Sequence, residues 1–165
     1  PEAIRQARKR LNRSIKLVAM NAEAMTFEDG SFDLVCGTGI LHHLDLAKAF
    51  GEVRRVLRPG GRALFIEPLG HNPAINLYRR LTPSMRSEDE HPLLMKDFEV
   101  AREMFVTVDL SFYNLSTLAA VPLRKTRLFD PVYRGLAKVD DFLMRTIPFS
   151  QRYAWNVLIE LRSQQ

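Results

Sequence analysis

The sequence predicts an α/β fold built on a mostly parallel sheet that is flanked by helices. Two short apolar runs, residues 32–37 and 62–66, have the length and composition of buried strands. Between them, Leu46, Phe50, Val53 and Leu57 recur every three or four positions, which places one apolar stripe on a helix. Two buried strands joined by a helix of this length form a right-handed parallel crossover. We therefore expect the chain to be organised around residues 31–68.

The remaining elements follow from helical spacing, strand alternation and capping residues. Asn72 and Pro73 suit the start of a helix, Asp97 suits another, and Pro148 ends a third. Apolar residues at helical spacing predict helices over residues 1–12, 72–81, 97–105 and 130–147. Alternating apolar and polar residues, or a short apolar run, predict strands over residues 15–20, 106–113 and 155–162.

Composition places the chain among ordinary globular proteins. Its 165 residues suffice for one domain, with 46% hydrophobic and 26% charged residues. The net charge of +5 would suit an anionic substrate, nucleic acid or an acidic membrane surface, but a modest excess usually serves solubility, so nucleic acid is not favoured. The single cysteine, Cys36, excludes an internal disulfide and fits a reducing compartment. No apolar run approaches the length of a transmembrane segment, and we expect a cytoplasmic protein.

Three motifs within the central stretch carry a family resemblance. They are Asp-Gly-Ser-Phe-Asp-Leu-Val (29–35), Leu-His-His-Leu (41–44) and Arg-Val-Leu-Arg-Pro-Gly-Gly-Arg (55–62). In this order and spacing they resemble the middle of a class I S-adenosylmethionine-dependent methyltransferase of type 11. The resemblance implies a Rossmann-like sheet in which the last strand runs antiparallel, inserted between two earlier strands. It covers residues 1–68 and the final strand.

In that family, a helix like residues 1–12 follows the second strand, and a glycine-rich loop comes earlier still. Neither the first two strands nor their cofactor-binding residues are found here, so we expect residues 1–165 to be a single partial domain, truncated at its N-terminus. We expect this fragment to bind S-adenosylmethionine very weakly and to be inactive without the missing segment. Residues 69–150 form a helical insertion before the last strand, either a lid over the substrate or simple core packing.

The resemblance also assigns cofactor-binding residues. Methyl transfer from a sulfonium depends mainly on positioning, because the leaving group is a neutral thioether. Asn21, Ala22 and Glu23 follow the predicted strand 15–20, where the family binds adenine, and a plain turn is the alternative. A second group lies at the end of the strand 32–37, where ligands bind in open α/β sheets, or where a flexible glycine turn would suffice. Its members are Cys36, Gly37 and Thr38.

Two histidines and one glutamate are candidates for the substrate side. His42 and His43 begin the next predicted helix, and an imidazole there could accept a proton from a substrate. Adjacent helical positions point about 100° apart, so at most one of them faces the site. Glu67 ends the strand 62–66 and would line the substrate pocket, or serve as a solvent-facing or helix N-terminal charge. No metal is expected, because the histidines and Cys36 lack ligand spacing.

The sequence therefore predicts an enzyme that transfers a methyl group from S-adenosylmethionine to a small-molecule acceptor. A lipid, a quinone or a natural-product-like molecule would fit. Two alternatives stay open: a catalytically silent Rossmann-like binding module, and an RNA or protein methyltransferase that would account for the positive charge. The expected partner is the small-molecule substrate, with no transmembrane segment, although the charge also allows peripheral contact with a membrane.

Overall fold

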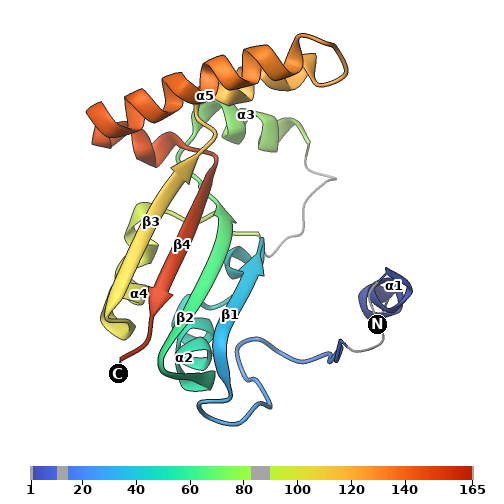
Figure 1. Cartoon of the computed structure of the whole chain (residues 1–165), viewed down its shortest axis with the longest axis vertical. Coiled ribbons are helices and arrows are strands. Elements are labelled where there is room, and N and C mark those ends of the chain that lie inside the picture. Colours follow the sequence, from blue (N-terminus) through green and yellow to red (C-terminus); the bar gives the residue numbers. More distant parts are fainter. Residues whose placement is uncertain (1, 11–14, 83–89, 165) are drawn as a thin grey trace.

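A four-stranded sheet forms the centre of the computed structural model, which describes residues 2–10, 15–82 and 90–164. The strands lie in the order β1-β2-β4-β3 (Figure 1). β1 pairs with β2 in parallel, and β4 pairs with both β2 and β3 antiparallel. The predicted mostly parallel sheet, with its last strand antiparallel and inserted, is therefore confirmed. The strands are β1 (Phe32–Thr38), β2 (Leu57–Pro68), β3 (Thr107–Tyr113) and β4 (Asn156–Arg162).

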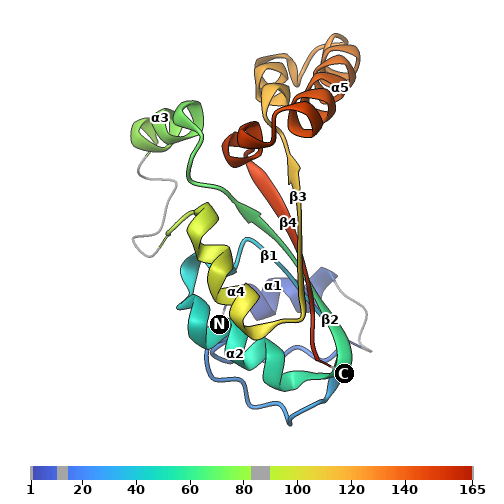
Figure 2. The same cartoon turned by 90° about the vertical axis from the view of Figure 1, so that its left-hand side faces the viewer.

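Helices α2 (Leu46–Val56) and α4 (Phe98–Met104) cover the same face of the sheet (Figure 2). The predicted apolar stripe of α2 packs there, and Phe50 of α2 and Phe98 of α4 are almost fully buried. On β4, alternate residues point into this core, because successive side chains of a strand face opposite sides. Each large apolar side chain buried in this way stabilises the fold by about 1.5–3 kcal/mol.

Two local predictions for the strands are wrong. Residues 15–20 form no strand; in this part of the chain the structure has a single bridge, between Asn21 and Ala24. The strand predicted over residues 62–66 begins earlier, at Leu57, so the sequence Pro59-Gly60-Gly61 lies inside β2. The register between β1 and β2 shifts there: Phe32 pairs with Leu57, but Leu34, two residues on, pairs with Arg62, five residues on. Gly60 has a φ of 74°, a left-handed conformation that favours glycine and permits this irregularity.

Four helical segments gather beyond the carboxyl ends of β1 and β2, and we call them the helical end (Figures 1 and 2). Asn72 caps the first of them, as predicted: its Oδ1 accepts hydrogen bonds from the N–H groups of Ala74 and Ile75. The second was not predicted, because its short 3₁₀ turns contain Pro122 and show no helical periodicity. The helical end consists of α3 (Pro73–Leu81), η4 (Ser116–Leu123), α5 (Phe129–Thr146) and η5 (Pro148–Tyr153).

Residues 69–150 contribute to the sheet as well as to the helical end. Their middle part supplies α4 and β3, which belong to the sheet and its covering layer. The 3₁₀ turn η3 (Met95–Asp97) leads into α4, and Asp97 accepts a hydrogen bond from the N–H of Leu94 at its start. The N-terminal helix α1 (Glu2–Arg10) lies apart from the sheet (Figure 1).

Asp140 joins α5 to η4 through a buried carboxylate. The side chain is 5% exposed, and the N–H groups of Leu115 and Ser116 donate to it over 2.9 and 2.6 Å. The hydroxyl of Thr117 donates as well, over 3.1 Å. Burial raises the pKa of Asp140, but the hydrogen bonds from Ser116, Leu115 and Thr117 outweigh it and hold the pKa below its usual value.

Replacing Asp140 by Asn is expected to destabilise the protein by about 1–3 kcal/mol, because buried N–H donors lose a charged acceptor. A lowered pKa in the folded state means that the stabilisation is present above the unfolded-state pKa of about 3.9. It is lost as the pH falls through the lower, folded-state pKa. Urea unfolding between pH 7 and acid should therefore show a flatter pH dependence for Asp140→Asn. Identical profiles for variant and wild type would contradict this role.

Candidate functional site

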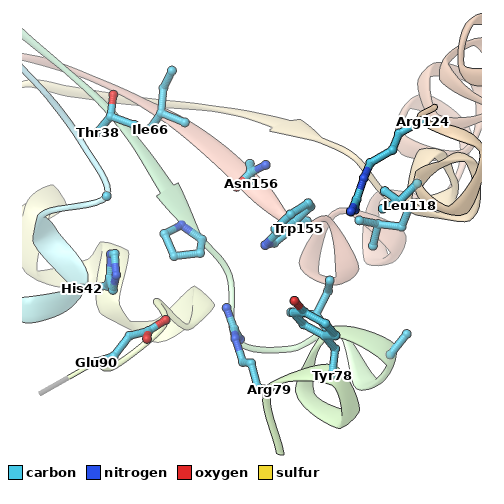
Figure 3. A pocket seen from close by; sticks show the side chains of 15 residues that line it. Thr38, His42, Ile66, Tyr78, Arg79, Glu90, Leu118, Arg124, Trp155 and Asn156 are labelled. Atoms are coloured by element: carbon cyan, nitrogen blue, oxygen red, sulfur yellow. The ribbon is translucent and has the colours of Figure 1, made fainter. Parts of the chain in front are cut away.

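A cavity of about 580 Å³ opens between the sheet and the helical end (Figure 3). It lies at the carboxyl ends of β1 and β2, where ligands bind in open α/β sheets. Most of its wall is apolar, with a few polar groups at separate points. The lining residues are Thr38, Gly39, His42, Ile66, Pro68, Ala74, Ile75, Tyr78, Arg79, Glu90, Leu118, Val121, Arg124, Trp155 and Asn156.

The topology explains how such distant residues meet. β1 and β2 are parallel, so Thr38 and Ile66 pair in register at the same edge of the sheet. β4 runs the other way, so its amino end arrives at that edge and brings Trp155 and Asn156. Because Asn72 sets the direction in which α3 begins, this helix borders the cavity.

His42 in the cavity wall and Glu67 behind it form a buried pair of side chains. Glu67 is fully buried, and its Oε1 accepts hydrogen bonds from the N–H groups of Ile40 and Leu41 over 2.9 and 3.0 Å. Nδ1 of His42 lies 2.7 Å from the other carboxylate oxygen, Oε2. Glu67 does not itself line the cavity, but its carboxylate contacts His42, which does.

This pair fixes the imidazole of His42. A carboxylate can only accept hydrogen bonds, so we assign the hydrogen to Nδ1, which leaves Nε2 as the acceptor of the ring. His42 is 8% exposed and lines the cavity, whereas His43 is exposed and does not. The two lie in the 3₁₀ turn η1 (Leu41–His43), ahead of α2 rather than at its start. Of the two predicted histidines, His42 is therefore the one in the wall of the larger cavity.

Three of the predicted cofactor residues come together at a second, smaller cavity. Ala22, Cys36 and Gly37 line a space of about 140 Å³ together with Ile40 and other apolar side chains. It lies beside β1 and is mostly apolar, which suits a flat aromatic ring more than a charged group. Thr38 lines the larger cavity instead.

The other predicted cofactor residues have structural contacts. Oδ1 of Asn21 accepts a hydrogen bond from the N–H of Glu23 over 2.9 Å. This contact closes a turn, which is the alternative to adenine binding given for these residues above. Glu23 in turn accepts from the N–H of Asp45, the residue that caps α2. Gly37 is required by packing, because an added Cβ would lie 2.9–3.0 Å from side-chain atoms of Ile40 and Phe65.

The helical end borders the larger cavity through α3 and η4. α5 packs behind η4 and lines a separate space of about 190 Å³ with Phe129 and Tyr133. The lid therefore stays a proposal, with α3 and η4 as its walls and α5 as the support behind them. Sequence reasoning did not find the cavity residues Trp155 and Arg124, because no motif marks them and their partners are distant in the chain.

Two features are absent from the part of the chain that the structure describes. No three or more His, Cys, Asp or Glu side chains gather in a group that could hold a metal ion. None of its helices combines the length and apolar character needed to cross a membrane.

Comparisons with known proteins concern the family of the sequence and the fold. Residues 1–65 match the type 11 family model described as a methyltransferase domain. A demethylmenaquinone methyltransferase of Chlorobaculum tepidum is 43% identical over 70 residues, which are 42% of this chain and 28% of that protein. The match therefore spans less than a third of that relative's length.

Two solved structures share the fold along nearly the whole chain. A methyltransferase of Thermotoga maritima, described as a possible histamine N-methyltransferase, superposes with a TM-score of 0.66 at 14% identity, covering 99% of this chain and 70% of its own. The phosphoethanolamine N-methyltransferase 2 of Haemonchus contortus, solved with S-adenosyl-L-methionine, gives a TM-score of 0.62 at 18% identity, covering 99% and 40%. The chain thus has the class I methyltransferase fold, and its first 65 residues match a type 11 methyltransferase domain.

Proposed function

We propose that this chain belongs to an enzyme that transfers a methyl group from S-adenosylmethionine to a small, largely apolar acceptor. The observation that carries the proposal is the cavity of about 580 Å³ with His42 in its wall. Its size is that of a small-molecule site, and its wall is apolar with few polar groups, as such sites are. The C. tepidum relative, named for a quinone substrate, supports an acceptor of this kind.

The residues present fit part of the proposed cofactor. The small apolar cavity of Ala22, Cys36 and Gly37 suits a purine ring, and it lies against the same strand, β1, that leads to the larger cavity. When bound, S-adenosylmethionine supplies an electrophilic methyl group on a sulfonium. Around it, the apolar walls exclude water from the acceptor, and His42 Nε2 takes the proton that the acceptor loses.

The geometry favours this proposal over the alternatives. Apolar walls from Ile66, Leu118 and Val121 offer little to a nucleic-acid chain, whose binding depends on neutralising phosphates. A silent binding module would need no oriented imidazole, yet His42 is held by a fully buried carboxylate inside the cavity wall.

A blocking substitution tests the cofactor site. Ala22 is partly buried and lines the small cavity, so Ala22→Trp is expected to fill it and weaken S-adenosylmethionine binding at least about tenfold. Ala24→Trp is the matched control, because Ala24 is exposed in the same turn without lining that cavity. Calorimetric titration of the full-length protein and both variants decides the matter. Equal affinities in all three would remove the cofactor from this position.

The acceptor class is tested separately, with S-adenosylmethionine carrying a labelled methyl group. The full-length protein is offered a demethylated quinol, a small amine, an RNA oligonucleotide and a peptide. We expect label in the solvent-extractable quinol fraction. Label in the RNA or peptide would support the alternative substrate class, and cofactor binding without any transfer would favour the silent module.

A further inference from the structure

The helical end exposes an unusual amount of apolar surface. Among the residues that the structure describes, five of the six most exposed large hydrophobic side chains belong to it or lie beside it, and Val106 is the sixth. Their exposed fractions run from 58% to 72%, so they contribute little to the core. The five are Leu77, Leu81, Leu128, Phe142 and Phe149.

On α5 the most exposed apolar side chains lie on one face. Asp140 and Met144 are buried against η4 and η5, and Phe142 lies about 200° from Asp140 around the helix, on the opposite side. Phe142 is 65% exposed, and Val139 beside it is 45% exposed. An inward face thus holds the helix on the protein, while an outward face presents apolar side chains to solvent.

The same outward face is positively charged. Arg134, Lys138 and Arg145 lie within about 80° of Phe142 around the helix, and all three are exposed. Of the acidic residues of α5, Asp140 points inward, whereas Asp141 and Asp130 lie about 100° and 120° round from Phe142, at the edge of this face. Cations therefore outnumber acids around Phe142, and apolar side chains beside exposed cations are typical of helices that lie on an anionic lipid surface.

We propose that the outer face of α5, formed by Arg134, Lys138, Val139, Phe142 and Arg145, docks this protein on an anionic phospholipid surface. The cations would approach lipid phosphates, and Phe142 would enter the boundary between headgroups and acyl chains. A symmetric pairing of two copies through this face fits less well, because it would bring the same cations together.

Docking there would also place the cavity close to the lipid. α3 lies at the same end of the molecule and carries exposed Leu77 and Leu81 (Figures 1 and 2). Because α3 borders the cavity of about 580 Å³, a lipid-soluble molecule could pass from the membrane into it without crossing water. The proposal does not depend on methyl transfer, since it concerns a surface outside the cavity.

Pelleting with vesicles tests the docking face. The full-length protein should pellet with vesicles of phosphatidylcholine and phosphatidylglycerol, and much less with phosphatidylcholine alone. The double variant Lys138→Glu/Arg145→Glu should lower the affinity at least about tenfold, and added salt should have the same direction of effect. Lys48→Glu/Arg54→Glu on α2 is the matched charge control, because it changes the net charge by the same amount and both residues are exposed away from the helical end.

A second pair of variants tests the apolar contribution. Phe142→Ser should weaken vesicle binding several-fold, whereas Val106→Ser, at a similarly exposed position near the start of β3, should leave it unchanged. Circular dichroism confirms that each variant is folded. Equal binding of all variants, or no preference for anionic vesicles, would overturn the proposal. The proposal would also be overturned if light scattering showed that the wild type is a dimer and that Phe142→Ser is a monomer, and if the wild type did not bind vesicles.

Discussion

Replacing Glu67 by Ala is expected to destabilise the protein by about 3–5 kcal/mol, among the largest effects of any single substitution in this chain. The carboxylate is fully buried and accepts from the N–H groups of Ile40 and Leu41 as well as from His42. Its loss leaves three donors without an acceptor, two of them buried. Leaving a buried donor unpaired costs more free energy than an ordinary hydrogen bond contributes. Denaturant unfolding at neutral pH measures the effect.

Glu67→Gln separates the orienting role from the structural one. The amide keeps an oxygen for the two backbone N–H groups, but its NH₂ group then faces Nδ1 of His42 and donates to it. Nδ1 would become the acceptor of the ring and Nε2 the donor, which is the wrong tautomer for a base. We expect a smaller loss of stability than for Ala, together with a fall in kcat of roughly 10²–10⁴-fold and little change in cofactor affinity.

The kcat of Glu67→Gln can be interpreted by comparison with a second variant, Glu67→Asp. Glu67→Asp retains the charge on a shorter side chain and should preserve part of the turnover. If Gln and wild type had the same kcat on an identified acceptor, Glu67 would serve the fold alone, and the assignment of the tautomer would be wrong.

His42→Ala is expected to lower kcat by about 10²–10⁴-fold on an acceptor that must lose a proton. His42 lines the cavity and is oriented by Glu67, so its removal deletes the group that takes the proton. Affinity for S-adenosylmethionine should stay nearly unchanged, because three of the predicted cofactor residues, Ala22, Cys36 and Gly37, line a separate cavity. Steady-state kinetics with the labelled cofactor, combined with calorimetry, separates the two effects.

His43→Ala is the matched control, because His43 neighbours His42 in the chain but is exposed and does not line the cavity. It should retain turnover close to that of the wild type. Free imidazole added to His42→Ala should restore part of the activity if the cavity admits it. Full activity of His42→Ala would show that the acceptor needs no base from this residue.

Several parts of this fold could be predicted because their signals are local. The apolar stripe of α2, the Asn72 cap of α3 and the alternation in β3 and β4 each lie within one segment, and each element formed where its signal predicted. Such elements depend on the spacing of apolar residues and on side chains that hydrogen-bond to backbone groups nearby in the chain. The run 15–20 has similar residues but failed, because a strand needs a partner strand to complete its hydrogen bonds.

The sequence by itself also determined which residues arrive at the ligand edge of the sheet. Parallel strands end at a common edge, so a motif at the end of β1 and one at the end of β2 had to meet there. In the structure Thr38 and His42 line the larger cavity, and Cys36 and Gly37 line the smaller one. The sequence did not settle their roles, because the same backbone positions serve turns and ligands alike.

What the tertiary structure decided were the partners across long stretches of chain. From the sequence alone, Glu67 could be a charge on the surface. In the structure β2 places it in the core, where its carboxylate accepts hydrogen bonds from the N–H groups of Ile40 and Leu41. Trp155 reaches the cavity because β4 is inserted antiparallel, and the outward face of α5 exists because buried Asp140 holds the helix on η4. These contacts depend on the direction and register of neighbouring elements, and no periodicity within a single segment encodes them.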